Sequence, residues 1–159
     1  MTARALRIVA VSLAVGSQLL VAQGPAPQPV QWKAVRAERT GAAPGTFSVE
    51  LAGSVTPGWH VYAQQEPENG PIPLRVALED SSRAEIAGTI GGTAPTRRKD
   101  PSFELETEVY LSDFTLVVPV RLKREPDTSG PIVLNVRYQA CNDHTCLPPR
   151  TVHLPVPLS

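Results

Sequence analysis

The sequence predicts an all-β protein built as an antiparallel β-sandwich, and two observations carry that prediction. Seventeen prolines and eleven glycines divide the 159 residues into pieces too short for most helices. Many of these pieces alternate apolar and polar residues with a period of two, as strands with one buried face do. About eight or nine such strands, with a turn signal roughly every 8–12 residues, indicate two sheets that bury their apolar faces against each other.

Length and charge limit the possible architectures and partners. A chain of 159 residues, 42% of them hydrophobic, can form one domain with its own core but hardly two. The formal net charge is zero, and basic residues gather only at 97–99. We therefore expect a single domain, and we expect it to be a monomer. We expect no nucleic-acid partner, because the chain lacks the clustered positive charge that nucleic-acid binding needs.

Residues 1–23 have the pattern of a signal peptide. Arg4 and Arg7 precede an apolar run that ends in small residues near position 22. The run is about 14 residues long, whereas a membrane-spanning helix needs about 20, so we expect cleavage and export rather than anchoring. Residues 24–29 would then be a Pro-rich linker and residues 30–159 the folded domain, located in the periplasm or otherwise exported.

The first half of the domain contains four predicted strands. Residues 30–35 suggest the first, and residues 47–55 alternate cleanly to form the second. The Pro-Gly pair at 57–58 signals a tight turn, and residues 59–62 after it form a short aromatic strand. Residues 74–78 follow a proline-rich loop and give the fourth strand.

The second half is less regular. Residues 84–90 suggest a strand, and residues 91–101 are expected to be loop. Residues 103–110 fit neither a helical nor a strand period, so we expect a partly exposed excursion there. Residues 114–122 give the longest alternation in the chain. Pro119 interrupts it and suggests a sheet edge or a bulge, because proline cannot donate to a strand ladder.

Both cysteines of the chain lie in its last hairpin. Cys141 and Cys146 stand between two alternating segments, residues 132–140 and residues 152–158, so a cysteine is expected at each foot of a short loop. Two Cα atoms placed in this way can come within the roughly 4.4–6.8 Å that a disulfide requires. Spacing alone leaves the bond unproven. In an exported protein, however, neighbouring cysteines are expected to be paired.

Three stretches, in this order, resemble the N-terminal periplasmic domain of the thiol:disulfide interchange protein DsbD. They are Gly-Trp-His-Val-Tyr-Ala-Gln at 58–64, the segment from Asp-Pro-Ser-Phe through Glu-Val-Tyr to the next strand at 100–120, and Tyr-Gln-Ala-Cys to Cys-Leu-Pro-Pro at 138–149. The resemblance covers about residues 30–158. It implies an immunoglobulin-like antiparallel β-sandwich.

The resemblance also implies a function. Cys141 and Cys146 would form a redox-active pair, in which Cys146 exchanges with the partner and Cys141 resolves the mixed disulfide. Electrons would come from a membrane-embedded reductase and pass to periplasmic thioredoxin-like proteins. Because family members carry the membrane domain in a longer chain, the donor is expected here to be a separate protein. Such a protein would be a thiol:disulfide oxidoreductase that needs no cofactor.

Further residues are expected to line the site. In the family an aromatic residue on a cap loop covers the disulfide, and Phe103 corresponds to it; the alternative is an ordinary core residue. A protonated His144 would favour a nearby thiolate, which Asp143 would oppose. Asp100 could tune the sulfurs, although charged loop residues are usually solvated. The full set of expected site-lining residues is Asp100, Phe103, Tyr62, Tyr138 and His144.

Two other interpretations stay open at this point. The domain could be a binding or assembly module whose disulfide only pins the last hairpin, although so short a loop gives on the order of 2 kcal/mol as a staple. Cys141, Cys146, His144 and His153 could also be considered as zinc ligands. Their spacing matches no finger or ribbon pattern, so we expect no metal.

Overall fold

The structure, a computed structural model, describes residues 27–41, 44–124 and 130–158. The described residues form strands and no helix, and hence no helix that could span a membrane. The predicted leader at 1–23 and most of the linker at 24–29 lie outside them. The strands are β1 (Val30–Arg39), β2 (Thr46–Val55), β3 (His60–Tyr62), β4 (Arg75–Leu78), β5 (Ala84–Ile86), β6 (Gly91–Gly92), β7 (Thr96–Lys99), β8 (Glu106–Tyr110), β9 (Phe114–Leu122), β10 (Ile132–Tyr138), β11 (Ala140–Cys141) and β12 (Arg150–Val156).

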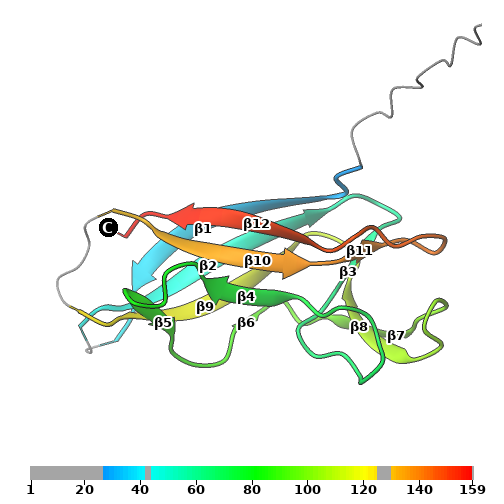
Figure 1. Ribbon diagram of the computed structural model, residues 1–159, viewed down its shortest axis with the longest axis horizontal. Helices are drawn as coiled ribbons and strands as arrows, with labels where there is room; N and C mark the ends of the chain where they lie inside the picture. Colours follow the sequence, from blue (N-terminus) through cyan, green and yellow to red (C-terminus); the bar gives the residue numbers. More distant parts are fainter. Residues whose placement is uncertain (1–26, 42–43, 125–129, 159) are drawn as a thin grey trace, which may run out of the picture.

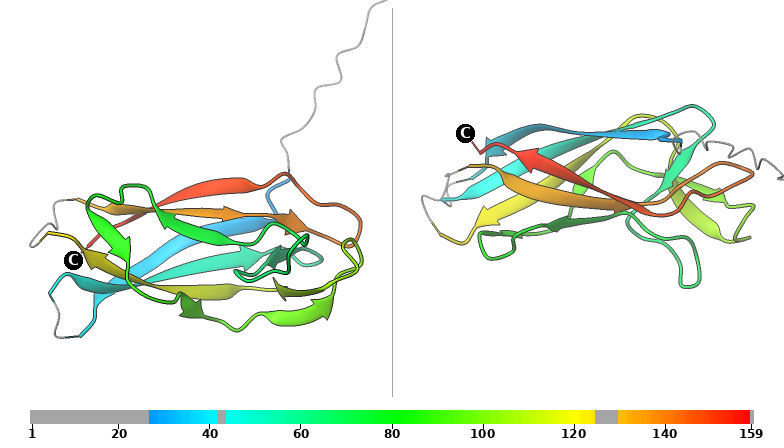
Figure 2. Two further views of the ribbon diagram at one scale, coloured as in Figure 1. Left: turned by 60° about the horizontal axis from the view of Figure 1, so that its bottom comes forward. Right: turned by 45° about the horizontal axis from the view of Figure 1, so that its top comes forward.

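Two antiparallel sheets form the body of the molecule. One has the order β1-β2-β9-β5, with β6 also paired to β9, and the other has the order β12-β10-β4. Figures 1 and 2 show the two sheets as layers, with β12 beside β1 at one edge. A third, smaller sheet of order β11-β3-β8-β7 lies at the end of the sandwich opposite the C-terminus (Figure 1). The predicted antiparallel sandwich is confirmed.

The core forms because the long strands alternate as the sequence does. In β2, Phe47, Val49 and Leu51 are fully buried while the residues between them are partly exposed. The same alternation runs along β9 and β10, so their inward side chains meet those of β2 between the layers. Each such large apolar side chain contributes about 1.5–3 kcal/mol by leaving water. This burial holds the scaffold that carries the smaller sheet.

Two segments differ from the sequence prediction, and β8 explains why. The expected excursion at 103–110 is largely the strand β8, and the expected loop at 91–101 contains β6 and β7. In β8, Val109 faces one side of the small sheet and Tyr110 the other, and both are buried. A strand covered on both faces shows no simple polar alternation, so its period could not be recognised.

Pro119 lies in the interior of a sheet rather than at its edge. It pairs with Ser48 of β2, and its carbonyl accepts the backbone N–H of Ala87, which follows β5. In an antiparallel ladder the nitrogen of a residue points to the same side as its carbonyl. On that side β5 has ended and β6 has not begun, so the missing N–H leaves no ladder bond broken. The sequence-based prediction of an edge or bulge is therefore wrong.

Gly92 should be far less tolerant of substitution than its neighbour Gly91. A Cβ on Gly92 would stand 2.2 Å from the Thr115 carbonyl oxygen, and the residue has a φ of +123°, which disfavours other residues. Nothing lies within 4 Å of a Cβ on Gly91. In urea unfolding we expect Gly92→Ala to lose about 2–4 kcal/mol and Gly91→Ala less than about 1. Equal losses would contradict this packing of β6 on β9.

Candidate functional site

Cys141 and Cys146 form a disulfide across the last hairpin, with their Cα atoms 4.1 Å apart. The loop between them is closed by its own polar groups. The Asn142 side-chain oxygen accepts the backbone N–H groups of His144, at 2.9 Å, and Thr145, at 2.8 Å. An asparagine that bonds the backbone two and three residues ahead is a local turn former. The four-residue loop is therefore shaped by Asn142 as well as by the disulfide.

Gln139 connects this hairpin to the rest of the fold. The chain leaves the β12-β10-β4 sheet after β10 and joins the small sheet as β11. At this change of sheet the Gln139 amide donates to the Leu147 carbonyl, at 3.2 Å, and accepts from the backbone N–H of Ile72, at 3.4 Å. The Gln139 side chain here makes hydrogen bonds in place of backbone bonds between strands. One of them joins the start of the hairpin to Leu147 at its end.

The small sheet separates the core from the disulfide. Ala140 pairs with Val61, and both belong to the core of the sandwich. The next pair along the same ladder is Cys141 with His60, and successive residues of a strand point to opposite faces. Cys141 and His60 therefore face away from the core. On that face Cys141 and four other residues form what we call the disulfide cluster: Tyr62, Phe103, Val109, Cys141 and Cys146.

The two sulfur-bearing residues differ in exposure. Cys141 is 1% exposed, while Cys146 is only half-buried. Cys146 is therefore the more accessible residue of the pair. The roles that the resemblance implies for the two residues stay predictions.

Asp100 is the polar centre of the site. It is 1% exposed, and its Oδ2 accepts the Tyr62 hydroxyl at 2.9 Å. Its Oδ1 accepts the backbone N–H groups of Ser102, at 2.8 Å, and Phe103, at 3.1 Å. Burial and this bond to Asp100 raise the pKa of Tyr62 above its ordinary value. The carboxylate is thus a buried group that links β3 to the loop after β7, rather than a solvated loop charge.

Phe103 packs on the disulfide cluster and not in the core of the sandwich. Its ring meets that of Tyr62 edge to face, with centroids 6.1 Å apart, and the residue is half-buried. The two backbone bonds to Asp100 hold the start of this turn, and Glu104 after it has a positive φ of 57°. Of the two alternatives that the sequence left for Phe103, its position fits the cap.

His60 is a site residue to which the sequence assigned no role. It is 3% exposed, its ring packs edge to face on Tyr62 at 5.1 Å, and its Nε2 stands 3.9 Å from Oδ2 of Asp100. Among the described residues Nε2 has no hydrogen-bond partner. Burial, followed by the charge of Arg98, lowers the pKa of His60 although Asp100 and Asp143 act in the opposite direction. The sequence does indicate that His60 shares a strand face with Tyr62, because the two residues are two positions apart.

Tyr138 and His144, both expected at the site, differ in where they lie. Tyr138 is in the core of the sandwich, where its ring packs on Trp32 with centroids 5.6 Å apart. It shares the core-facing side with Ala140, and the change of face comes only at Cys141. His144 is exposed at the tip of the hairpin. The expectation that Tyr138 lines the site is therefore wrong, whereas a role of His144 beside the cysteines stays a prediction.

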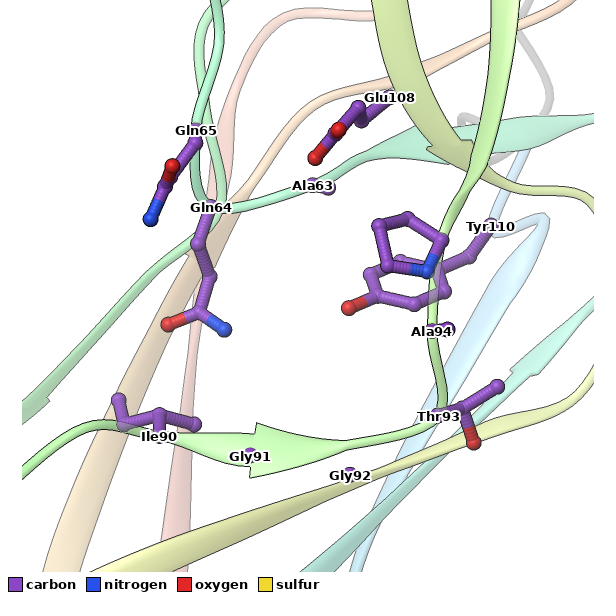
Figure 3. A pocket seen from close by; sticks show the side chains of 11 residues that line it. Ala63, Gln64, Gln65, Ile90, Gly91, Gly92, Thr93, Ala94, Glu108 and Tyr110 are labelled. Atoms are coloured by element: carbon purple, nitrogen blue, oxygen red, sulfur yellow. The ribbon is translucent and has the colours of Figure 1, made fainter.

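The described residues offer no second obvious reaction centre. They contain no group of three or more His, Cys, Asp or Glu side chains placed to hold a metal ion. An open groove of about 290 Å³ lies between β6 and the residues after β3. Figure 3 shows the Gln64 amide and the Tyr110 hydroxyl pointing into it. Its lining includes no residue of the disulfide cluster.

Comparison with known proteins points to the same family as the resemblance. Residues 27–157 match the family model described as thiol:disulfide interchange protein DsbD, N-terminal. The crystal structure of the Neisseria meningitidis DsbD N-terminal domain in the reduced form superposes with a TM-score of 0.51 at 15% identity. The match covers 69% of this chain and 76% of that chain, and it shows a shared immunoglobulin-like fold. No curated protein matches the sequence.

Glu66 is a second unusual titratable group close to this end of the molecule. Its Oε1 accepts the backbone N–H of Glu108 at 3.2 Å, while its buried Oε2 has no partner among the described residues. Burial is the main cause that raises its pKa to about 7, and the charges of Glu108 and Asp100 add to it. Between an ordinary value of 4.5 and about 7 the folded state therefore binds the proton that the unfolded state has lost.

Stability should consequently fall as pH rises from about 4.5 to 7, and Glu66→Gln should remove this loss. The unfolded state binds fewer protons in that window, so the free energy of unfolding decreases with pH. At pH 8 we expect Glu66→Gln to be more stable than the wild type by about 1 kcal/mol, because solvent screens part of the effect. Urea unfolding across the pH range measures it. The exposed Glu68→Gln is the control, and equal profiles for all three proteins would refute the prediction.

Proposed function

This chain belongs to the family of DsbD N-terminal domains, and from that membership we propose that it passes electrons to periplasmic thioredoxin-like proteins through Cys141 and Cys146. The observation that carries the proposal is the disulfide itself, with one half-buried sulfur and one buried sulfur under the Phe103 loop. A purely structural staple has no need of such a cover. We propose export to the periplasm and a membrane-embedded reductase as the electron donor.

The reaction transfers two electrons and two protons in two exchange steps. In the reduced protein, the Cys146 thiolate attacks a sulfur of the partner's disulfide and forms a mixed disulfide, and the other partner sulfur leaves as a thiolate. Cys141 then attacks the Cys146 sulfur, the bond from Cys146 to the partner breaks, and the partner leaves with both sulfurs reduced. The donor reverses these steps on the Cys141–Cys146 bond. The exposure of Cys146 supports its role as the entry point.

The loop that carries Phe103 would act as a cover that partners displace. An uncovered disulfide would react with any thiol, whereas an apolar ring over the sulfurs excludes water and unsuitable partners. The hydrogen bonds that the backbone N–H groups of Ser102 and Phe103 donate to Asp100 hold this cover in place when no partner is bound. Access would then depend on a partner that can push the ring aside.

Cys141→Ser should trap a mixed disulfide, and Cys146→Ser should not. The probe is a thioredoxin-like protein with one active-site cysteine changed to serine and the other carrying thionitrobenzoate. The Cys146 thiolate of the Cys141→Ser protein should release thionitrobenzoate and remain bound to the partner, because no second thiol resolves the bond. The buried Cys141 left in Cys146→Ser should react at least about tenfold more slowly. The wild type should release both thionitrobenzoate and the partner.

A binding module with a structural disulfide would behave differently in two respects. Its variants would trap no partner, and its disulfide would have a reduction potential below about −300 mV, the range of structural bridges. It would also keep its partner when both cysteines are serine. Those results together would overturn the exchange function.

Phe103→Ala should make the disulfide easier to reduce. Loss of the ring exposes the sulfurs, so the rate of reduction by dithiothreitol should rise about tenfold, as expected when access limits reactivity. The rate is followed by alkylation of the released thiols. Leu111→Ala is a matched control, since Leu111 is an exposed apolar residue outside the disulfide cluster. An unchanged rate in a folded Phe103→Ala protein would remove the covering role.

A further inference from the structure

We propose that His60 is the acid–base group of the exchange reaction, accepting the proton of Cys141 when this thiol resolves the mixed disulfide and donating a proton to its sulfur when the disulfide is reduced. The inference rests on the proposed exchange function. It adds a residue with a chemical role that neither the cysteine pair nor its cover supplies.

The register of β3 and β11 places His60 opposite Cys141. His60 and Cys141 are direct partners in the antiparallel pairing of β3 with β11. Side chains of such a pair lie on the same face of the sheet with their Cβ atoms about 4.5–5.5 Å apart. Both point away from the core, onto the face of the disulfide cluster. An imidazole is therefore the side chain directly across the ladder from Cys141.

One ring nitrogen of His60 lacks a hydrogen-bond partner among the described residues. The large majority of buried side-chain nitrogens and oxygens have a hydrogen-bond partner, and each exception needs a reason. Nε2 of His60 is buried and has no partner among the described residues, in a structure where Cys141 is oxidised. A disulfide sulfur carries no hydrogen to donate. Reduction gives Cys141 an S–H group on the same face of the sheet, and the unpartnered nitrogen is an acceptor for such a group.

The surroundings of His60 favour its neutral form. The charged and titratable groups around His60 are Tyr62 on its own strand, Arg98 on β7, Asp100 after β7 and Asp143 in the hairpin. Arg98 is held by an ion pair with Asp143 at 3.2 Å. Burial and Arg98 keep the imidazole neutral at pH 7, as a base must be, while Oδ2 of Asp100 at 3.9 Å stabilises the imidazolium once formed. An adjacent general base is a usual way to activate a weak nucleophile.

The proton and the electron pair can be followed through both directions. In resolution, the S–H proton of Cys141 moves to Nε2 of His60 and the sulfur's electron pair forms the bond to Cys146. The bond between Cys146 and the partner's sulfur breaks, and the partner leaves as a thiolate. After resolution the imidazolium gives its proton to solvent. In reduction, a donor thiolate attacks Cys146, the Cys141–Cys146 bond breaks, and His60, protonated again by the solvent or by the donor's second thiol, donates that proton to the departing Cys141 sulfur.

The test isolates resolution with glutathione disulfide as the probe. Reduced protein is mixed with it, the reaction is quenched with acid at intervals, and mass spectrometry follows the glutathione adduct on Cys146 and its conversion to the intramolecular disulfide. At pH 7 the adduct should persist about 100-fold longer in His60→Gln than in the wild type, at the low end of the effect of a general base. The control is His153→Gln on β12, whose partner is Glu79 far from the cysteines. It should close like the wild type.

The pH profile of the wild type provides a second measurement that needs no variant to fold. With His60 as the base, the closure rate should stay nearly level from about pH 6.5 to 8 and fall at lower pH as the imidazole becomes protonated. Without a base it should rise about tenfold per pH unit up to the pKa of an ordinary thiol, near 8.5. Equal closure rates in folded His60→Gln, or a tenfold rise per unit in the wild type, would overturn the role of His60 alone. A wild type that forms no adduct would overturn the exchange function itself.

Discussion

The pairing of β11 with β3 is the constraint on which the rest of the site depends. It sets which residue of the last hairpin faces the core and which faces the disulfide cluster, because a shift of one residue exchanges the two faces of a strand. In the observed register Ala140 lies in the core and Cys141 lies opposite His60. Only two residues of β11 make this pairing. The hydrogen bond that the Gln139 side chain donates to the Leu147 carbonyl therefore helps to hold the hairpin in this register.

A buried carboxylate organises the other side of the site. Burying the charge of Asp100 would be costly without hydrogen bonds, and its oxygens accept from the Tyr62 hydroxyl and from the backbone of Ser102 and Phe103. These bonds connect the strand below the disulfide to the loop above it. The same carboxylate faces His60, so one group sets the position of the cover and the charge that the imidazole experiences.

The sequence was sufficient for the sandwich and the cysteine pair, because long strands such as β2 alternate cleanly and the two cysteines lie on one hairpin. It was insufficient where a strand is covered on both faces, as in β8, since no polar alternation remains to be recognised. The residue-level site was predicted only in part. Tyr138 is close to Cys141 in sequence but faces the core, and His60 is distant in sequence but adjacent in the ladder. Both facts depend on strand register, which a single sequence does not encode locally.

The difference in exposure between the two cysteines has a consequence for proton transfer. Thiol–disulfide exchange requires each attacking sulfur to lose its proton. The half-buried Cys146 can exchange protons with water, whereas the fully buried Cys141 is shielded from it. Shielding protects the resolving sulfur from foreign thiols, but it also removes the solvent as a base. A protein that buries one sulfur of the pair therefore needs an internal proton acceptor for that sulfur, whereas the half-buried sulfur does not need one. His60, which pairs with Cys141 in the β3–β11 ladder, is placed for this role.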